Sequence, residues 1–455
     1  MDVGAGKRAQ VEFVSANPTG PLHVGRSRGA IVGDTIARIL EAAGYSVERE
    51  YYFNNAGQQM RNLGTSLRVR YLQELGIPVE FDEKTFYQGE YLMDIAKQLV
   101  TEKGNTLAEE DWQPFKEYAE RKIFDMIKAT LLRVNIKHDI FFNENSLYDS
   151  GAVWDTLKVL EQRGHVYKAV KAEVTDNSKD EDEDTDGKAQ ATWFRSSAYG
   201  DSKDRVMVKA SGEPTYTLPD IAYHANKLER GFDLLVNILG ADHYVQHQVV
   251  KYGVLAMGLD PAPIHVIIIQ LVHLLRGGER LKMSTRRGDI ETLDDLIDQT
   301  SADAVRYILL ARNANSHVDF DIDLAVKQSN ENPVYYIQNA HVRCAGIFRE
   351  AAARGVSDEG ADVSLLGDAE LSFIRRALEL GEQIEFSARE LEPHRIAFYA
   401  MELAAIFHPI YDSVRALHSE VSPEVQKARL RFYRAAQVVF KRVLTLMGMS
   451  APDVM

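Results

Sequence analysis

The sequence predicts an α/β protein in two halves, a Rossmann-like parallel-sheet domain with insertions followed by an all-helical bundle. Three observations predict this architecture. The chain opens with a strand–helix–strand pattern, continuous apolar runs recur at residues 234–239 and 264–272, and the pattern from Leu293 onward is helical almost to the end. A chain of 455 residues is long enough for two or three domains.

The strand–helix–strand unit lies at the N-terminal end. Val11–Val14 is a short apolar run, apolar residues then recur at helical spacing up to Leu40, and Gly44 stops the helix. Val47–Phe53 alternates in polarity like a strand. Two strands joined by a helix in this way form a right-handed βαβ unit. The two later runs do not alternate, as expected of strands buried on both faces of a parallel sheet.

Two segments interrupt the α/β pattern and are predicted to be insertions. Residues 59–130 have helical spacing, whereas residues 158–208 contain β-like segments such as Ala189–Ser196. The second insertion also holds the acidic run Asp176–Asp186, which we interpret as a solvated loop tip. The parallel-sheet domain, with both insertions, is expected to span residues 1–285.

The C-terminal half is predicted to be a helical bundle at residues 331–455, joined to the first domain by a connecting region at residues 286–330. No internal repeat is visible in this half. The helices expected from the apolar spacing are Leu293–Arg312, Pro333–Arg354, Leu366–Leu391, Pro393–Leu417 and Pro423–Met447.

Bulk composition narrows the possible functions. The formal net charge is −14, which argues against nonspecific binding to nucleic acid, although an RNA site needs only a local basic face. Cys344 is the single cysteine, so neither an internal disulfide nor a multi-cysteine zinc site is possible. No apolar run has the length of a membrane span, and the N-terminus lacks a signal-peptide pattern. We therefore expect a cytoplasmic protein with no membrane partner.

The first candidate site lies where the first strand turns into its helix, in the segment Pro18–Arg26. This is the carboxyl edge of a parallel sheet, where α/β proteins bind ligands. The start of the helix offers free N–H groups to a phosphate, and Gly25 allows close approach. His23 can donate to a phosphate oxygen on which negative charge develops. Taken alone, the His-x-Gly pattern is more often structural than functional.

Two further segments have the composition of phosphate- or ribose-binding loops. Gly278–Gly288 follows the last apolar run, and a loop that carries Lys282 between glycines can close over a triphosphate. Gly240 ends another apolar run and is followed by Asp242 and His243. A glycine at a strand end lets a ribose approach, and a nearby carboxylate can bind its hydroxyl groups. Each of these signals is weak by itself.

Taken together, the segments resemble the two signature motifs of class I aminoacyl-tRNA synthetases, and the closest resemblance is to arginyl-tRNA synthetase. It runs nearly from end to end of the chain. The segments that carry it are Val11–Gly25, Glu50–Gly57, Tyr216–Asp220, Asp319–Asp323, Asn332–Gln338 and the helical tail up to Asp453.

The resemblance implies a two-step reaction with ATP, which brings Mg²⁺, and no structural metal. Arginine would be activated as arginyl-adenylate and then transferred to the 3′ end of tRNA(Arg). The residues implied in catalysis are His23, Gly25, Arg26 and Lys282. The residues implied in ATP binding are Pro18, His23, Gly25, Gly240, Asp242, His243, Lys282, Met283 and Ser284.

The resemblance also assigns an arginine site. Glu12, Tyr216 and Asp220 would face the guanidinium group, whose planar set of donors requires carboxylates at fixed angles. Without the resemblance, Glu12 would be interpreted as an outward strand residue and Asp220 as a helix cap. The residues expected at the α-amino end are Ser15, Asn17 and Gln248, with Gln246 as the alternative to Gln248.

Three features depart from the family pattern. Arg26 replaces the last histidine of the first signature, so another group must supply its share of phosphate stabilisation. Thr285 replaces the second lysine of the other signature and is followed by Arg286 and Arg287, either of which could substitute. Members of the family carry an extra N-terminal domain, and here only a short segment precedes the first strand, so we expect a truncated form.

The last predicted helix carries a basic stripe beside its apolar stripe. As a bare pattern this is a solvated face, whereas the resemblance implies contact with the anticodon stem-loop of tRNA(Arg). The residues of the stripe are Lys427, Arg431, Arg434 and Lys441, and the tyrosines available to stack on loop bases are Tyr335, Tyr336 and Tyr433.

One apparent metal motif fails on inspection. Asp319, Asp321 and Asp323 imitate the start of a calcium loop, but Leu324 and Asn330 occupy the positions that require glycine and glutamate. Their alternation instead predicts an edge strand or a connector, and no metal is expected there.

Two other functions stay open at this stage. One is a nucleotidyl transferase of the same fold that acts on small molecules, against which the long helical tail counts. The other is a catalytically silent RNA-binding paralogue. His23, Lys282 and Asp220 argue against a silent paralogue, whereas the replacements at Arg26 and Thr285 leave room for it.

Overall fold

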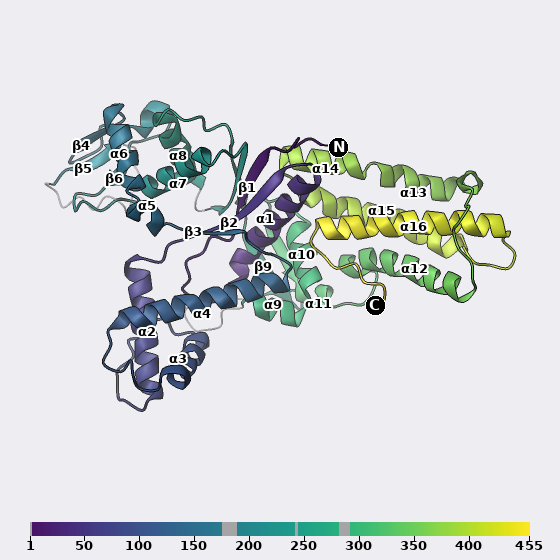
Figure 1. The fold of residues 1–455 in the computed structure, drawn as a ribbon, viewed down its shortest axis with the longest axis horizontal. Coiled ribbons are helices and arrows are strands. Elements are labelled where there is room, and N and C mark those ends of the chain that lie inside the picture. Colours follow the sequence, from purple (N-terminus) through teal and green to yellow (C-terminus); the bar gives the residue numbers. More distant parts are fainter. Residues whose placement is uncertain (1, 175–188, 242–243, 282–291) are drawn as a thin grey trace.

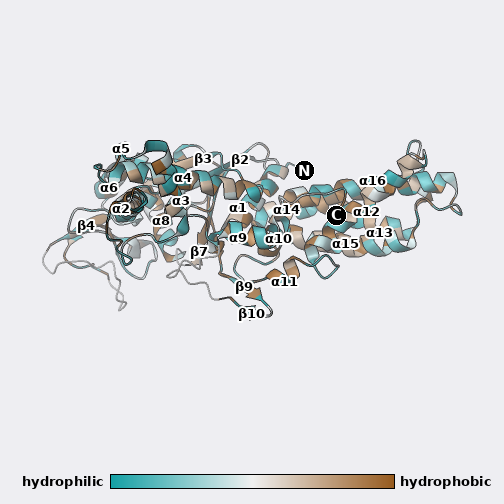
Figure 2. Cartoon of the chain, turned by 90° about the horizontal axis from the view of Figure 1, so that it is seen from below, coloured by the Kyte–Doolittle hydropathy of each residue, from teal (hydrophilic) through white to brown (hydrophobic). Residues whose placement is uncertain are grey.

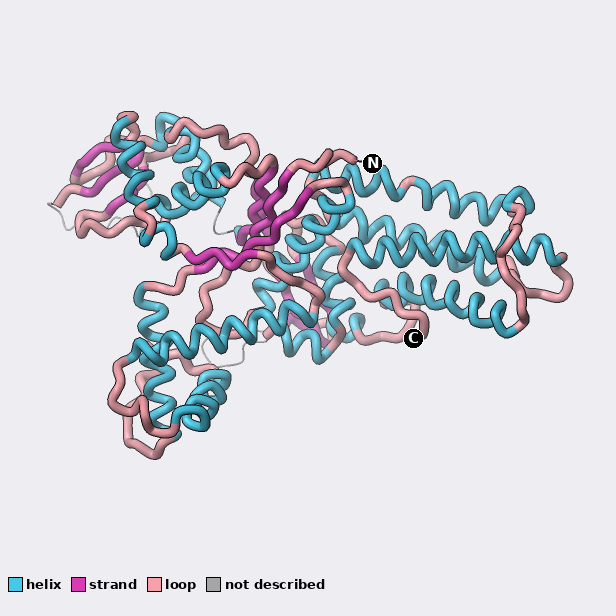
Figure 3. The backbone as a smooth tube through the Cα atoms, in the orientation of Figure 1, coloured by secondary structure: helices cyan, strands magenta, loops and turns pink. Residues whose placement is uncertain are grey.

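A parallel sheet forms the centre of the molecule in the computed structural model, which describes residues 2–174, 189–241, 244–281 and 292–455 (Figures 1 and 3). The strand order is β3-β2-β1-β7-β8, and every neighbouring pair is parallel. The Rossmann-like fold class is therefore confirmed. The bounds are β1 (Arg8–Glu12), β2 (Ser46–Phe53), β3 (Ile140–Asn143), β7 (Leu234–Gly240) and β8 (Ile264–Ile269).

The predicted βαβ unit is confirmed as β1, α1 (Val24–Ala42) and β2. Gly44 follows the helix with φ +95°, and a Cβ there would collide with the Asp2 carboxylate, so only glycine fits this position. The chain leaves β1 toward β2, but leaves β7 toward β8 on the other side of the sheet. The order therefore reverses between β1 and β7, and this is where ligands bind in such sheets.

The first insertion consists of three helices, as predicted. Apolar residues such as Leu67, Leu99 and Phe115 are fully buried where these helices pack together. In Figure 1 this unit projects from the sheet on the side away from the C-terminal bundle. Its helices are α2 (Gly57–Glu74), α3 (Glu90–Lys103) and α4 (Trp112–Arg133).

The second insertion packs against helices that lead back into the central sheet. Its antiparallel strands are β4 (Val166–Ala169), β5 (Ala191–Phe194) and β6 (Arg205–Val208). The acidic run at residues 176–186 lies outside the described residues. The helices around these strands are α5 (Asn145–Asp149), α6 (Ala152–Gln162), α7 (Thr217–Glu229) and α8 (Tyr244–Ala256).

The sequence suggested that the apolar run at 264–272 is one strand, but the structure divides it. It breaks after Ile269, and the following strand belongs to a second sheet, of order β10-β9-β11. The fully buried Arg28 of α1 holds the crossing by donating to the carbonyl groups of Gln270 (3.1 Å) and Ser316 (2.5 Å). The strands of this sheet are β9 (Val272–Arg276), β10 (Glu279–Arg280) and β11 (Val318–Asp321).

This second sheet takes strands from both sides of the expected boundary at residue 285. The Asp319–Asp323 segment forms the edge strand β11 and enters the short helix α11 (Ile322–Ala325), in agreement with the strand interpretation. The helix predicted at 293–312 is divided into α9 (Leu293–Gln299) and α10 (Ala302–Leu310) because Ser301 caps the second helix.

The C-terminal half is a helical bundle, as predicted. Cys344 is fully buried in it and is a free cysteine. The helix expected at 366–391 is interrupted at Glu379 and forms two helices. The helices carry both apolar and polar faces in Figure 2, as bundle packing requires. They are α12 (Pro333–Ala353), α13 (Asp368–Leu378), α14 (Leu380–Glu390), α15 (His394–Ser413) and α16 (Pro423–Leu446).

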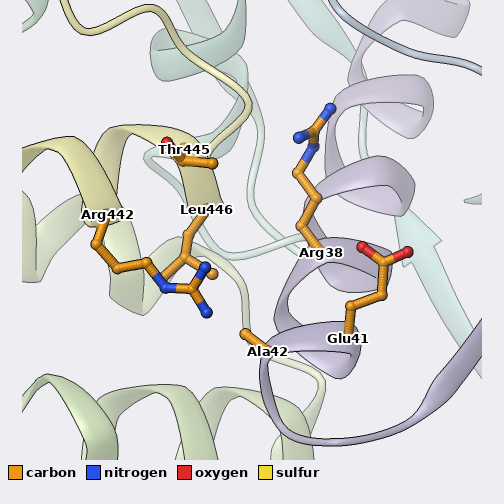
Figure 4. A pocket seen from close by; sticks show the side chains of 6 residues that line it. All are labelled: Arg38, Glu41, Ala42, Arg442, Thr445 and Leu446. Atoms are coloured by element: carbon orange, nitrogen blue, oxygen red, sulfur yellow. The ribbon is translucent and has the colours of Figure 1, made fainter.

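The two halves meet along α1. Arg306 of α10 is fully buried and donates to the Val134 carbonyl (2.5 Å), to the Asp34 carboxylate (2.6 Å) and to the Met447 carbonyl. Beside this contact lies a small cavity of about 210 Å³, in which side chains of α1 face side chains of α16 (Figure 4). No described helix is long and apolar enough to cross a membrane.

Candidate active site

The loop after β1 has an unusual backbone that brings polar groups to the sheet edge. Val14 and Ser15 have positive φ angles of 70° and 41°, which non-glycine residues seldom adopt outside functional sites. The Ser15 hydroxyl donates to Glu12 Oε1 (2.9 Å). Asn17 Oδ1 accepts from the backbone N–H of Asn54 (3.0 Å), which ties this loop to the end of β2.

His23 caps the first turn of α1 and has a donor available. Its Nδ1 accepts from the backbone N–H of Gly25 (2.9 Å), so the proton of the neutral ring lies on Nε2. Burial and the nearby charge of Arg26 lower the pKa of His23, which keeps the ring neutral at pH 7. Nε2 is buried and has no partner among the described residues. A Cβ at Gly25 would lie only 3.1 Å from His23 Nδ1.

The other residues expected to bind ATP are only partly described. Arg26 is exposed at the start of α1, Pro18 is buried in the turn that precedes it, and Gly240 is the last residue of β7 beside the switch point. The remaining expected residues lie outside the described residues: Asp242, His243, Lys282, Met283 and Ser284, together with Thr285, Arg286 and Arg287.

Three carboxylates gather at the same sheet edge, and we call them the carboxylate cluster: the buried Glu12 and Glu144 and the half-buried Asp220. Glu12 ends β1, Glu144 follows β3, and Asp220 lies in the first turn of α7. Each is at most partly accessible, with Glu12 6% and Glu144 7% exposed. Burial raises the pKa of Tyr52 of β2, and the charges of all three carboxylates raise it further.

The cluster has an excess of negative charge. Burial, and then the charge of Glu144, raise the pKa of Asp220 to about 7. Burial also raises the pKa of Glu144, which accepts from the Tyr52 hydroxyl (2.6 Å) and from Asn54 Nδ2 (2.8 Å). Gln246 Nε2 donates to Asp220 Oδ2 (2.6 Å). These neutral donors orient the carboxylates without neutralising them.

Lys227 is the only cation in contact with the cluster among the described residues. Its ammonium group is fully buried and donates both to Glu12 Oε2 and to Asn237 Oδ1 (2.7 Å). Asn237 Nδ2 in turn lies 3.0 Å from His224 Nε2, and burial lowers the pKa of His224 to about 3. The lysine therefore neutralises Glu12, whereas Asp220 and Glu144 have no ionic partner in the part of the chain that the structure describes.

The structure brings together some of the expected arginine-binding residues and not others. Glu12, Ser15 and Asp220 converge. The Asp220 N–H donates to the Tyr216 carbonyl (3.2 Å), which gives the helical spacing expected, but the Tyr216 side chain is 75% exposed. Gln246, the alternative to Gln248, is the glutamine that contacts Asp220.

Sequence analysis missed Glu144, Lys227 and Tyr52. Glu144 could have been found, because it ends a strand at the same edge as Glu12, but the short strand β3 was not predicted. No sequence signal marks Lys227 as the partner of Glu12, since 215 positions separate them. The described residues contain no group of three His, Cys, Asp or Glu side chains suited to hold a metal ion.

The expected RNA-binding stripe lies along α16, but two of its members are engaged within the protein. Arg431 and Arg434, about half exposed, both donate from Nε to Asp358 Oδ2 (2.8 Å each). These N–H groups, first those of Arg434, lower the pKa of Asp358 to about 2. Lys441 is exposed and Lys427 is partly buried. Tyr433 is fully buried and Tyr336 packs on His408 (4.3 Å between ring centroids). Tyr433 therefore cannot stack on RNA.

Two family descriptions match the chain. Residues 2–326 match "tRNA synthetases class I (R), catalytic domain", and residues 337–455 match "DALR anticodon binding domain". The first range contains the central sheet, both insertions and the second sheet. The second begins inside α12 and contains the rest of the bundle.

Relatives of known name match over nearly the whole chain. The chain is 43% identical over 463 residues to the arginine–tRNA ligase of Heliobacterium modesticaldum, covering 99% of this chain and 78% of that protein. It is 42% identical to the same enzyme of Bacillus licheniformis, covering 100% and 79%. A structure described as an arginyl-tRNA synthetase of Campylobacter jejuni has a TM-score of 0.86 at 32% identity, covering 99% and 94%. Thermus thermophilus arginyl-tRNA synthetase shares the fold, with a TM-score of 0.75 at 19% identity and coverage of 99% and 83%.

Proposed function

The chain belongs to the class I arginine–tRNA ligases, which activate arginine and transfer it to tRNA, and we propose that the carboxylate cluster is its arginine-binding site. The observation that carries the proposal is the charge of Asp220 and Glu144. Glu144 is buried and Asp220 is half-buried, both have a raised pKa, and neither has an ionic partner among the described residues. A buried carboxylate is stabilised by a cation, and a guanidinium group supplies one with a planar set of donors.

In the proposed complex, the guanidinium group lies between Asp220 and Glu144, and Lys227 holds Glu12 in place. We propose that Ser15, Asn17 and a glutamine bind the α-amino end of arginine. We prefer Gln246 to Gln248 because Gln246 already donates to Asp220 (2.6 Å). Tyr216 is proposed to cover the ligand from its exposed position at the start of α7.

The ATP site is proposed at the start of α1, beside the switch point of the sheet. The arginine carboxylate attacks the α-phosphorus of ATP, the bond to pyrophosphate breaks, and pyrophosphate leaves with Mg²⁺. His23 Nε2–H donates to an oxygen on which charge develops, and Gly25 keeps the His23 ring in position. A ribose hydroxyl of the tRNA then attacks the adenylate carbonyl, and AMP leaves. This sequence uses no covalent enzyme intermediate.

Lys282, Met283 and Ser284 are proposed to close over the triphosphate, and Gly240, Asp242 and His243 to bind the ribose. Pro18 would shape the turn under the nucleotide, and Arg26 would take the place of the missing signature histidine. These roles rest on the motifs, because most of these residues lie outside the described ranges.

The tRNA is proposed to follow the bundle, with Lys427, Arg431, Arg434 and Lys441 near its anticodon arm, and the enzyme is proposed to work in the cytoplasm. We propose domains at 1–271, 272–330 and 331–455, because β9 and β10 belong to the sheet that also contains β11. The expected boundary at residue 285 would separate β9 and β10 from β11, although the three strands form one sheet.

ATP–pyrophosphate exchange with arginine and its analogues, measured with and without tRNA, tests this proposal. Citrulline replaces one guanidinium nitrogen by oxygen and carries no charge, so it should support no measurable exchange. Lysine should also fail, because an ammonium group cannot reproduce the planar arrangement of donors. Exchange with citrulline at a rate close to that with arginine would show that the carboxylate cluster does not select substrates by the charge of their side chain. RNA binding without any exchange would favour the silent paralogue.

A further inference from the structure

We propose that a cavity between α12 and α16 binds one unstacked nucleobase of single-stranded RNA, and that Arg431 and Arg434 hold the adjoining phosphate. The proposal rests on the proposed role of α16 in tRNA binding, and it identifies a specific nucleotide site within that surface. The site lies far along the bundle from the carboxylate cluster (Figure 1). It takes no part in the chemistry of arginine activation.

The volume and the lining of the cavity suit a small, partly apolar group. Its volume is about 340 Å³, near the lower limit for ligand sites, and Phe348, Val356 and Leu430 supply apolar walls. The Arg434 guanidinium lies 4.6 Å from the centroid of the Phe348 ring. An aromatic ring and an arginine plane are the two surfaces on which unpaired RNA bases stack.

Asp358 prepares the two arginines to bind an anion. Its carboxylate accepts hydrogen bonds from Nε and Nη2 of Arg434 (2.8 Å each) and from Nε of Arg431 (2.8 Å). Its backbone carbonyl group accepts a hydrogen bond from Nη2 of Arg431 (3.0 Å). Nη1 of each arginine has no partner among the described residues. Asp358 itself is 8% exposed, whereas both arginine side chains are about half exposed. The two guanidinium groups are therefore held by Asp358 and stay partly accessible to an anion beside the cavity.

The charge of this site favours RNA over an acidic peptide or a second copy of the chain. Two arginines against one carboxylate leave a net positive charge in a protein of net charge −14. A cavity with a partly apolar lining next to two guanidinium groups held by Asp358 matches one nucleotide, which joins a planar base to a phosphate. Asp358 is a positioning residue in this arrangement, because it acts through the arginines.

The test fills the cavity without disturbing the core. Ala352 lines the cavity and is exposed, and its neighbour Ala353 is exposed on the same helix but does not line it. Ala352→Phe should weaken binding of the full-length chain to an anticodon stem-loop of an arginine tRNA by about 5- to 150-fold, as expected for the loss of one stacked base. Ala353→Phe should bind within about twofold of wild type, well below that loss.

Abasic nucleotides then show whether a base enters the cavity. One abasic substitution in the loop should weaken binding to wild type by a similar factor and have almost no further effect on Ala352→Phe. The proposal is overturned if Ala352→Phe and Ala353→Phe bind alike, or if every abasic effect is the same in both proteins. Melting temperatures of both variants check the fold. As a second route, Arg434→Gln should weaken binding and reduce its salt dependence, whereas Arg442→Gln, in the cavity near α1, should change neither.

Failure of the nucleotide site can be distinguished from failure of the proposed function. A wild-type chain that charges tRNA with arginine, together with an Ala352→Phe variant that binds the stem-loop normally, would remove the nucleotide site and leave arginine activation intact. Failure of the wild type to activate arginine would remove the proposed function whatever the cavity binds.

Discussion

The carboxylate cluster and the contact between Asp358 and α16 use charge in opposite ways. The cluster has three carboxylates and, among the described residues, one contacting cation, Lys227, which pairs with Glu12 alone. At α16 one carboxylate receives N–H groups from two arginines. Burial and a neighbouring carboxylate raise the pKa of Asp220 to about 7, while the donors of Arg434 lower that of Asp358 to about 2. One region lacks positive charge and the other has an excess of it.

The difference indicates what each region binds. The cluster is buried, so its unpaired carboxylates weaken the unliganded fold until a cationic ligand arrives. The arginines on α16 are half exposed, so water solvates their free N–H groups, and an anion can bind there without a large penalty. Arginine suits the first region and RNA phosphate suits the second. Substitutions at the two regions should therefore differ in size as well as in kind.

The largest effect is expected from Lys227→Met, which removes the only cation that contacts the cluster within the described ranges. Glu12 would remain buried and unpaired, and the free energy of unfolding should fall by about 3 to 5 kcal/mol. Urea unfolding measures this loss. A double variant with Glu12→Gln should recover most of the stability but not arginine affinity. If Lys227→Met is as stable as wild type, Lys227 does not hold Glu12.

Asp220→Asn tests whether this carboxylate selects arginine. Truncating one partner of a buried charge pair costs about 2 to 5 kcal/mol, so kcat/KM for arginine should fall by roughly 30- to 4,000-fold. The amide keeps the volume, so the KM for ATP should stay close to wild type, and the melting temperature without arginine should not fall. Steady-state charging is the measurement, with the exposed Asp155→Asn as a matched control. A loss under about threefold would move the recognition of arginine to Glu144.

The pKa of Asp220 predicts opposite pH responses for arginine affinity and for the stability of the free protein. Only the ionised carboxylate pairs with guanidinium, so arginine affinity should rise about tenfold from pH 6 to pH 8. Because the folded pKa is raised, the contribution of Asp220 to stability without ligand is full at low pH and is lost as pH rises through about 7. Melting curves with and without arginine measure both. Asp220→Asn should remove both dependences.

The smallest effect is expected from Asp358→Asn, since its arginine partners are half exposed. The free energy of unfolding should fall by about 1 kcal/mol or less. The folded pKa of Asp358 is lowered to about 2, so its contribution is present above the unfolded pKa and disappears as pH falls through about 2. Urea unfolding at pH 7 should show little difference from the exposed Glu359→Gln control. A loss as large as that of Lys227→Met would contradict the comparison between the two regions.

Local patterns account for much of what could be predicted. Caps, prolines and apolar spacing predict the βαβ unit and the starts of α12 at Pro333 and α16 at Pro423. Each of these signals involves residues only a few positions apart. The position of His23 at a sheet edge follows from the same local reasoning. The break after Ile269 could not be predicted, because a buried arginine from α1 imposes it through carbonyl groups distant in sequence.

The sequence by itself determined the two-part architecture, the residues of both signature motifs and the presence of Glu12, Asp220 and a basic stripe. Only the tertiary structure decided which charges meet: Lys227 with Glu12, Gln246 with Asp220, and Asp358 with two arginines of α16. The physical reason is the separation along the chain over which each interaction acts. Helix and strand signals act between residues a few positions apart, whereas the ionisation of a buried carboxylate depends on whatever the fold packs around it.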